Sequence, residues 1–319
     1  MLCKELYKSS LSTRLMKYRQ FKDMKVSEIG MGCWAVGGNA FGNSYGMTDD
    51  AESIRTIKKA VQLGCNFFDT ADVYGHGYSE ELLGLALQSI REKVFIATKA
   101  GGSYFYNDER WGHMNFTAEY LQFAIEQSLH RLRTSYVDVY QLHNPTLQMI
   151  KEGEVFKPLR EFQKQCKIKQ VGVSVFTLDE GLAALDFVDS VQCVFNIIDP
   201  RNYEMMETAK RRGIAVIVRE PLANGLLTGK YSTTSSFEKG DIRNRTPQDY
   251  MEGVAELAGE IKKRFPMLTP AQVCLKYILN FDCVTTVIPG AKTEKQIEEN
   301  LAASDLPRLT ADELAFFGS

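Results

Sequence analysis

The stretch 65–78, CNFFDTADVYGHGY, brings a carboxylate and a phenol to the end of a predicted strand. Its apolar start is typical of a buried strand that ends at Asp69, and Tyr74 follows in a loop next to Gly75. Chemistry gathers at the C-terminal ends of parallel strands, so the stretch predicts a site on a parallel sheet. Taken alone, the stretch fits a purely structural interpretation equally well, in which Asp69 caps a turn and Tyr74 fills the loop.

Outward from this stretch, apolar strand patterns alternate with amphipathic helix patterns along the chain. Strands are predicted at residues 29–34, 66–69, 94–99, 137–143, 169–175, 191–196, 214–219 and 284–288. Helices are predicted at 49–63, 80–90, 117–132, 155–165, 178–187, 203–212, 252–265, 269–280 and 293–303. This repeat predicts an α/β fold, a (β/α)8 TIM barrel with an N-terminal β-hairpin at 17–29 and a long loop after the seventh strand. A final helical segment at 311–317 is expected to pack across the barrel.

A doubly wound sheet is the alternative architecture, and its dinucleotide-binding turn requires three spaced glycines. The first predicted strand ends in GMGCWA at 30–35, which lacks the third glycine, so the barrel is preferred. No charge run or low-complexity linker divides the chain, and residues 16–319 are predicted to form a single domain. Residues 1–15 are polar and basic, which predicts an unstructured extension, with a transit peptide as the alternative.

The bulk composition excludes several classes of function. Lys and Arg number 38 against 40 Asp and Glu, which lacks the basic excess of nucleic-acid-binding proteins, and no apolar run is long enough to cross a bilayer. The seven cysteines are scattered without a C-x-x-C pair, and the four histidines lack zinc spacing, so no metal site is predicted. Cysteines in apolar contexts indicate a reducing compartment, and a cytoplasmic location is predicted. No pattern indicates an oligomeric state.

Two later strands also end in a polar residue, the third at Lys99 and the fourth at His143. In a barrel these residues would meet Asp69 and Tyr74 at one face. A lysine ammonium favours the phenolate of a neighbouring tyrosine, and a carboxylate keeps that lysine charged. A histidine beside the phenol donates to a carbonyl oxygen, so the group as a whole suits protonation of an alkoxide as hydride reaches a carbonyl carbon.

Each of these residues also has a structural interpretation. His143 precedes Asn144-Pro145 and fits a capped turn, and Asp69 fits a purely structural role. Lys99 is the hardest to explain structurally, because a lysine is seldom buried without a partner. The mouth of the site is predicted to be lined by Trp34, Tyr104 and Trp111.

The motifs that carry this group resemble those of the aldo-keto reductases from about Met16 to Ala303. The matching motifs are FDTADVYG at 68–75, ATK at 97–99, QLHN at 141–144, GVS at 172–174 and IPGAKTEKQIEEN at 288–300. The resemblance implies reversible reduction of an aldehyde or ketone by a nicotinamide cofactor, NADPH with NADH as the alternative. It implies that Tyr74 is the general acid and base, that Lys99 adjusts its pKa, that Asp69 supports Lys99, and that His143 orients the carbonyl.

The same resemblance implies the cofactor-binding residues. Ser174 and Gln192 match the residues that bind the nicotinamide carboxamide, and Trp34 with Gly32 and Cys33 lies at the nicotinamide end. The loop at 219–231 matches the one that covers the pyrophosphate, closed by Arg243 or Arg245. The positions that the resemblance implies in and beyond this loop are Arg219, Pro221, Leu222, Asn224, Gly225, Lys230, Arg243, Gly290, Lys292, Gln296, Glu299 and Asn300. The last five match the adenosine end, where Lys292 is expected to pair with a 2′-phosphate, although residues 293–300 alone also fit an ordinary capped helix.

Two positions depart from the family pattern. Val175 stands where many members have asparagine, and Arg219 stands where an aromatic ring commonly stacks on the nicotinamide. We expect an altered cofactor affinity and a relaxed preference for NADPH from both, and Arg219 is expected to contact either the nicotinamide face or a substrate anion.

Two other functions fit the same barrel. One is a cofactor-binding regulatory subunit, since the sequence also resembles the β subunits of voltage-gated potassium channels. The other is an aldolase in which Lys99 forms a Schiff base with its substrate, which leaves Tyr74 and the 288–300 motif unexplained.

Overall fold

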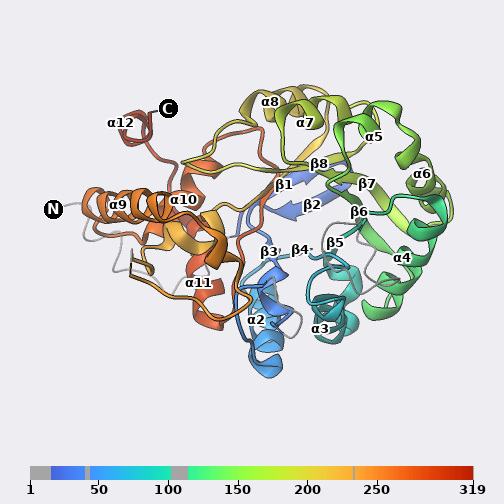
Figure 1. Ribbon diagram of the computed structural model, residues 1–319, viewed down its shortest axis with the longest axis horizontal. Helices are drawn as coiled ribbons and strands as arrows, with labels where there is room; N and C mark the ends of the chain where they lie inside the picture. Colours follow the sequence, from blue (N-terminus) through green and yellow to red (C-terminus); the bar gives the residue numbers. More distant parts are fainter. Residues whose placement is uncertain (1–15, 40–43, 102–113, 233, 319) are drawn as a thin grey trace.

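The computed structural model describes residues 16–39, 44–101, 114–232 and 234–318. Two short strands, β1 (Tyr18–Phe21) and β2 (Met24–Ser27), pair antiparallel as the predicted hairpin. Eight further strands form one parallel sheet in consecutive order (Figure 1). They are β3 (Met31–Gly32), β4 (Phe67–Asp69), β5 (Phe95–Ala100), β6 (Val137–His143), β7 (Ile168–Ser174), β8 (Ser190–Val194), β9 (Ala215–Arg219) and β10 (Thr286–Val287).

The sheet closes on itself through its first and last strands. Ile29 forms a parallel bridge with Val287, and Gly32 forms another with Gly290. Closure leaves no open sheet edge, so the predicted (β/α)8 barrel is confirmed. Gly32 is required at this seam, because a Cβ there would lie 2.7 Å from the carbonyl oxygen of Ile288.

Helices surround the barrel on its outside (Figure 1). They are α2 (Asp50–Gln62), α3 (Tyr78–Leu87), α4 (Ala118–Arg131), α5 (Leu147–Glu152), α6 (Lys157–Lys164), α7 (Leu178–Ala184), α8 (Tyr203–Arg211), α9 (Gln248–Arg264), α10 (Pro270–Leu279), α11 (Glu294–Ala302) and α12 (Ala311–Ala315). Threonine side chains cap the first turns of α4, α7, α10 and α11, which fixes where these helices begin after their loops. None of the described helices has the length and apolar character that crossing a bilayer requires.

The N-terminal hairpin closes one end of the barrel interior. Its apolar side chains, Phe21, Met24 and Val26, are buried and form one cluster with residues on the inner face of the strands. The other residues of that cluster are Phe67, Ala97, Val139, Ala215 and Ile217 on the strands, and Ile288 directly after β10. Since Phe67 and Ala215 begin their strands, the hairpin plugs the N-terminal end of the barrel and leaves the C-terminal end for a site.

Three elements differ from the expected ones. The first barrel strand is only Met31–Gly32, and Trp34 begins a short 3₁₀ helix, η1 (Trp34–Val36). Helix α5 was not predicted, because its six residues are too few to show a helical period. The terminal segment does not cross the barrel: Phe317 stacks on Phe265, 6.3 Å between ring centroids, beside α9 and α10. The prediction for residues 1–15 lies outside the described residues.

Candidate active site

The centre of the site is a buried ion pair between two neighbouring strands. Lys99 on β5 is fully buried, and its Nζ donates to Asp69 Oδ1 at 2.5 Å and to the carbonyl oxygen of Thr70 at 2.9 Å. Its third donor reaches Tyr74 Oη at 3.2 Å. The three ammonium hydrogens are therefore all used, and one of them links the carboxylate to the phenol.

Two glutamines hold the other oxygen of the same carboxylate. Gln141 on β6 and Gln192 on β8 both donate through Nε2 to Asp69 Oδ2, at 3.1 Å and 2.7 Å. Gln192 Nε2 also lies 3.2 Å from Gln141 Oε1. Asp69 is thus fixed by side chains from three other strands, and its position cannot change without disturbing the barrel interior.

Tyr74 is held by its ring as well as by its hydroxyl. The ring stacks on Trp34 with centroids 5.4 Å apart and an interplanar angle of 12°. The loop that carries it passes very close to η1, because a Cβ on Gly75 would lie 2.1 Å from the carbonyl oxygen of Gly37. Only glycine fits this contact, and its φ of +58° is also one that glycine adopts freely.

His143, the last residue of β6, faces Tyr74 edge-on with ring centroids 6.1 Å apart. Burial lowers its pKa well below the usual value, and the charges of Lys99 and Arg219 act in the same direction. The imidazole is therefore neutral at neutral pH and carries one N–H that it can donate.

The protonation states of the central pair follow from opposing effects. Burial alone would lower the pKa of Lys99, but Asp69 and Tyr74 outweigh it, so this pKa is raised and the ammonium persists. Burial raises the pKa of Tyr74, which the Lys99 charge opposes and Asp69 reinforces. Lys99 therefore acts on the phenol in the expected direction, but burial dominates and the phenol of the isolated chain is neutral.

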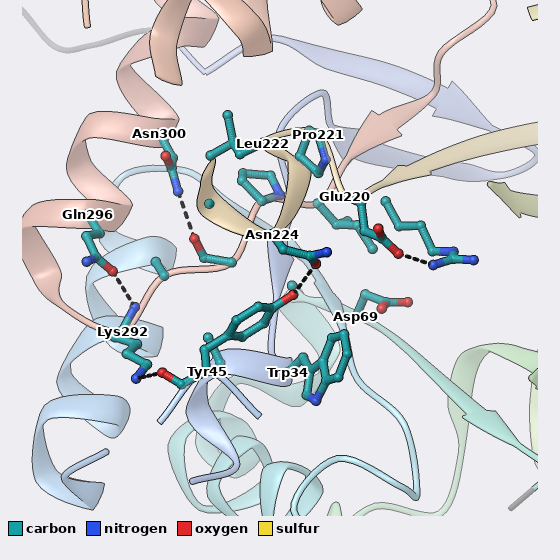
Figure 2. A pocket seen from close by; sticks show the side chains of 18 of the residues that line it. Trp34, Tyr45, Asp69, Glu220, Pro221, Leu222, Asn224, Lys292, Gln296 and Asn300 are labelled. Carbon is teal, nitrogen blue, oxygen red and sulfur yellow. Dashed lines mark hydrogen bonds and ion pairs between the residues drawn. The ribbon is translucent and has the colours of Figure 1, made fainter. Parts of the chain in front are cut away.

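A cavity of about 430 Å³ opens from this group and runs along the C-terminal end of the barrel (Figure 2). Asp69, Tyr74, His143 and Trp34 line its inner part. The predicted cofactor positions that line it are Gly32, Gln192, Arg219, Pro221, Leu222, Asn224, Gly225, Lys230, Arg243, Gly290, Lys292, Gln296, Glu299 and Asn300.

Two predicted cofactor positions do not line this cavity. Cys33 is fully buried in the core between sheet and helices, and its Sγ lies 3.6 Å from the carbonyl oxygen of Met31. Cys33 comes directly after β3, at the start of η1, and its side chain enters this core and not the cavity. Ser174 is buried just behind the lining. The predicted substrate residues Tyr104 and Trp111 lie outside the described residues, while Trp34 is at the cavity as expected.

The loop after β9 covers one side of the cavity with an unusual backbone. Glu220, Ala223 and Asn224 have positive φ values of 54°, 46° and 56°, followed by Gly225 at 87°. Successive turns of this kind direct backbone N–H groups into a concave surface that suits phosphate oxygens. Asn224 is fixed by Tyr45 Oη, which donates to its Oδ1 at 2.7 Å (Figure 2).

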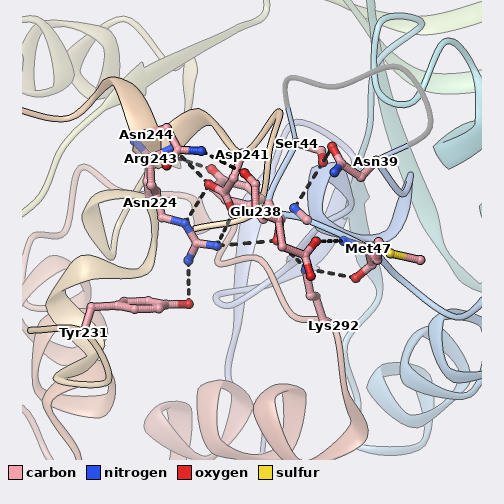
Figure 3. Close-up of polar contacts among 12 residues, drawn as sticks. Asn39, Ser44, Met47, Asn224, Tyr231, Glu238, Asp241, Arg243, Asn244 and Lys292 are labelled. Carbon is pink, nitrogen blue, oxygen red and sulfur yellow. Dashed lines mark hydrogen bonds and ion pairs between the residues drawn. The ribbon is translucent and has the colours of Figure 1, made fainter. Parts of the chain in front are cut away.

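Arg243 holds the outer part of this loop in place (Figure 3). It donates to both carboxylate oxygens of Asp241, at 2.9 Å and 2.6 Å, and to Tyr231 Oη at 2.5 Å. Its guanidinium also lies 4.4 Å from the ring centroid of Phe237. A parallel bridge between Ser44 and Asp241 then joins this loop to the segment before α2.

At the far end of the cavity, hydrogen bonds hold the residues before α11 in place. Lys292 Nζ donates to the carbonyl oxygens of Tyr45 and, at 3.1 Å, Met47 (Figure 3). Gln296 Oε1 accepts from Lys292 N at 2.8 Å, and Asn300 Nδ2 donates to the carbonyl oxygen of Gly290 at 3.2 Å (Figure 2). Burial lowers the pKa of Lys292, and Arg243 adds to this, so two cations converge here.

Several buried polar atoms near the catalytic group lack a hydrogen-bond partner within the described residues. They include Ser174 Oγ, Gln192 Oε1 and Asn144 Oδ1, together with His143 Nδ1 and Arg219 Nε. Buried polar atoms are normally paired, which indicates that a ligand supplies the partners of these atoms. A carboxamide offers both donors and an acceptor. The residues present therefore fit the nicotinamide cofactor expected from the sequence.

Asn144 was not among the predicted binding residues, although it directly follows His143 at a strand end. Val175, the first departure from the family pattern, has an apolar side chain buried in the core. The amide that Val175 lacks is therefore present at Asn144. Tyr45 and Asp241 were also missed, and both act through loops whose meeting no sequence period reveals.

Arg219, the second departure, is ion-paired with Glu220 and donates to the carbonyl oxygen of Val175 at 3.3 Å. Its guanidinium lies 4.6 Å from the ring centroid of Phe176. Its Nε has no partner in the described part of the chain, and the residue lines the cavity. The planar group is thus held in place beside the catalytic group.

Comparisons with known proteins agree with this geometry. A model of the aldo/keto reductase family matches residues 28–317. YqkF of Bacillus subtilis, described as an uncharacterized oxidoreductase, is 30% identical over 92% of this chain and 92% of its own. The NADH-specific methylglyoxal reductase of Escherichia coli is 29% identical over 91% and 93%. The holo form of AKR11C1 from Bacillus halodurans is 28% identical with a TM-score of 0.77, covering 95% and 96%. The family match spans every barrel strand and every segment that lines the cavity.

Proposed function

The chain belongs to the aldo-keto reductase family, and we propose that Asp69, Tyr74, Lys99 and His143 perform its chemistry. As a member of that family it is an NAD(P)H-dependent oxidoreductase that reduces an aldehyde or ketone to an alcohol, reversibly. The observation that carries the assignment of residues is the unbroken chain of hydrogen bonds from Asp69 through Lys99 to Tyr74.

When bound, the cofactor supplies the hydride that reduces the carbonyl carbon. Tyr74 Oη donates its proton to the carbonyl oxygen as negative charge develops there, and the Lys99 ammonium stabilises the phenolate that remains. Asp69 keeps Lys99 charged and directed at the phenol. His143, being neutral, donates its N–H to the same carbonyl oxygen and orients it.

Lys99 is unsuited to the competing Schiff-base function. A lysine that attacks a carbonyl must lose its proton, which requires a lowered pKa. Here the pKa is raised, and all three ammonium hydrogens are bonded. The same bonds would have to break before the amine could reach a substrate.

We infer that Ser174, Gln192 and Asn144 hold the carboxamide of the cofactor, with Asn144 replacing the amide that Val175 lacks. The loop from Arg219 to Tyr231 supplies backbone donors for the phosphates. Lys292, with Arg243 nearby, supports a preference for NADPH over NADH, because the additional 2′-phosphate brings negative charge to this end of the cavity. The substrate is a small carbonyl compound. We propose that Tyr104 and Trp111 line the mouth of the site together with Trp34.

The deciding experiment follows NADPH oxidation with para-nitrobenzaldehyde for the wild type and for Tyr74→Phe. Removing a general acid is expected to lower kcat by at least ~100-fold. Cofactor affinity, measured by quenching of protein fluorescence, should stay within a factor of ~2, because the phenol hydroxyl is not among the groups assigned to the cofactor. Binding of NADPH without turnover in either protein would instead support the regulatory subunit.

A further inference from the structure

A second cavity, of about 750 Å³, lies at the opposite end of the barrel from the catalytic group. It is bordered by the N-terminal hairpin, by Gly213 and Ile214 before β9, and by Val284 and Thr285 before β10. All these segments precede strands, whereas the catalytic residues follow or end them. The two cavities are therefore separated by the barrel interior and by the hairpin that plugs it.

The lining of this second cavity is strongly basic. It contains two carboxylates, Glu28 and Asp282, against six cationic side chains: Lys17, Arg19, Lys22, Lys210, Lys276 and Arg308. Both carboxylates are already engaged, Glu28 with Arg19 at 3.1 Å and Asp282 with Arg308. The remaining excess of positive charge is unusual for a chain whose formal net charge is −2.

Lys276, in the last turn of α10, is the deepest of these cations. The residue is only 2% exposed, yet it lines the cavity, and its ammonium has no hydrogen-bond or ion-pair partner among the described residues. Lysines are almost never this buried unless they are paired. Burial lowers its pKa to about 8, and Lys17, Arg19 and Arg308 add to the effect while Glu28 opposes it.

Capping of a helix C-terminus does not account for this lysine. The carbonyl groups that follow the last turn of α10 are taken by Arg19, which donates to the carbonyl oxygens of Leu279 at 2.8 Å, Phe281 at 3.2 Å and Val284 at 2.6 Å. Lys276 is thus a buried, repelled cation with an unused set of three donors.

We propose that this cavity is a binding site for a small phosphate-bearing anion, with Lys276 at its base. Both guanidinium groups in the lining are committed to carboxylates, so the planar fork that recognises a carboxylate is not available. The free donors are ammonium groups on separate elements, Lys210 on α8 and Lys276 on α10. Lys17, whose Nζ donates to the carbonyl oxygen of Leu306 at 3.4 Å, adds a further positive charge. Point charges arranged in this way suit a phosphate group.

The test titrates inorganic pyrophosphate into the enzyme by calorimetry at pH 7, without divalent cations. Saturating NADPH keeps the probe out of the catalytic cavity, which also binds phosphates. One site per chain is expected, and Lys276→Met should weaken it by at least ~10-fold, the value of a charged hydrogen bond. Lys58→Met, which removes an exposed lysine on α2, should leave the affinity unchanged.

Turnover of para-nitrobenzaldehyde by Lys276→Met verifies that the variant is folded, since this residue is remote from the catalytic group. Lys210→Met serves as a second variant that removes an exposed side chain and is expected to weaken binding by ~3-fold or more. The proposal is overturned if NADPH abolishes all binding of pyrophosphate, or if wild type, Lys276→Met and Lys210→Met bind it equally.

Discussion

Asp69 accepts hydrogen bonds from side chains on three other strands of the barrel. One carboxylate oxygen accepts from Lys99, and the other accepts from Gln141 and Gln192. The same residue therefore keeps Lys99 charged and ties β4 to β5, β6 and β8. Catalysis and stability are coupled here, because a group that supports the proton donor is also a buried charge that must remain paired.

Lys99→Met is expected to impair both roles. The change leaves the Asp69 carboxylate buried without a cation, so unfolding free energy at pH 7 should fall by about 3–5 kcal/mol, measured by urea denaturation. Turnover should fall by at least ~100-fold, since the phenolate formed by Tyr74 loses its stabilising charge.

The double variant Lys99→Met with Asp69→Asn is the matched control, because it removes both members of the pair. It should regain most of the lost stability and none of the lost turnover. Recovery of turnover in the double variant would show that Lys99 serves only to neutralise Asp69 and has no direct effect on Tyr74.

At this scale, the strand-end residues were predictable and their partners were not. Asp69, Lys99 and His143 each end an apolar run, so their common location follows from the barrel. Gln141 and Gln192 meet Asp69 only because the register of four strands turns them inward, which no local pattern shows. Cys33 comes directly after β3, where the backbone turns into η1, and its side chain is buried in the core.

At the scale of elements, the cavity is enclosed by loops that bind one another. The loop after β9 meets the segment before α2 through the Ser44–Asp241 bridge, and Ile242 N donates to the carbonyl oxygen of Ser44 at 3.0 Å (Figure 3). Lys292, just before α11, reaches the same segment at Tyr45 and Met47. Three loops distant in sequence therefore depend on each other for their positions.

Lys292→Met tests whether this lysine selects NADPH or only fastens the loops. Loss of a charged hydrogen bond to a 2′-phosphate should raise KM for NADPH by ~10-fold or more, while KM for NADH should change by less than ~3-fold. Lys295→Met, an exposed lysine on α11, is the control and should leave both constants unchanged. Equal increases for the two cofactors would assign Lys292 to loop fastening alone.

Long elements with a regular apolar pattern were predicted correctly, and short or irregular ones were not. β6 has the predicted limits, Val137–His143, because Val137, Val139, Tyr140 and Leu142 give it the apolar pattern of a buried strand. The loops around the cavity have no period, and their structure depends on contacts such as Arg243 with Asp241 and Tyr231. The family resemblance indicated that the loop after β9 covers the cofactor, but its partners appear only in three dimensions.

At the scale of the whole molecule, the barrel has two chemically different ends. The C-terminal end holds the catalytic group, and the N-terminal end carries the hairpin plug and the basic cavity. Lys276, in the basic cavity, makes the stability of the fold depend on pH. Its pKa is about 8 in the folded chain against an ordinary 10.5, so the unfolded chain binds more protons between these values. The free energy of unfolding should therefore rise as pH increases from about 8 to 10.5, and be lowest, as far as this group is concerned, below pH 8.

Lys276→Met removes this dependence while keeping most of the side-chain volume. At pH 7 the charge of Lys276 disfavours the folded state, so the variant should be more stable than the wild type in urea denaturation, by about 1–2 kcal/mol after solvent screening. The advantage should decline as pH rises toward 10.5, because the wild-type lysine is then neutral in both states. Other groups that titrate in this range are common to both proteins and cancel in the difference. Added pyrophosphate should stabilise only the wild type and reduce the gap at pH 7, since a ligand that binds the folded state stabilises it. A variant that is less stable than the wild type by the same amount at every pH would mean that the ammonium is solvated and that its stem contributes only packing.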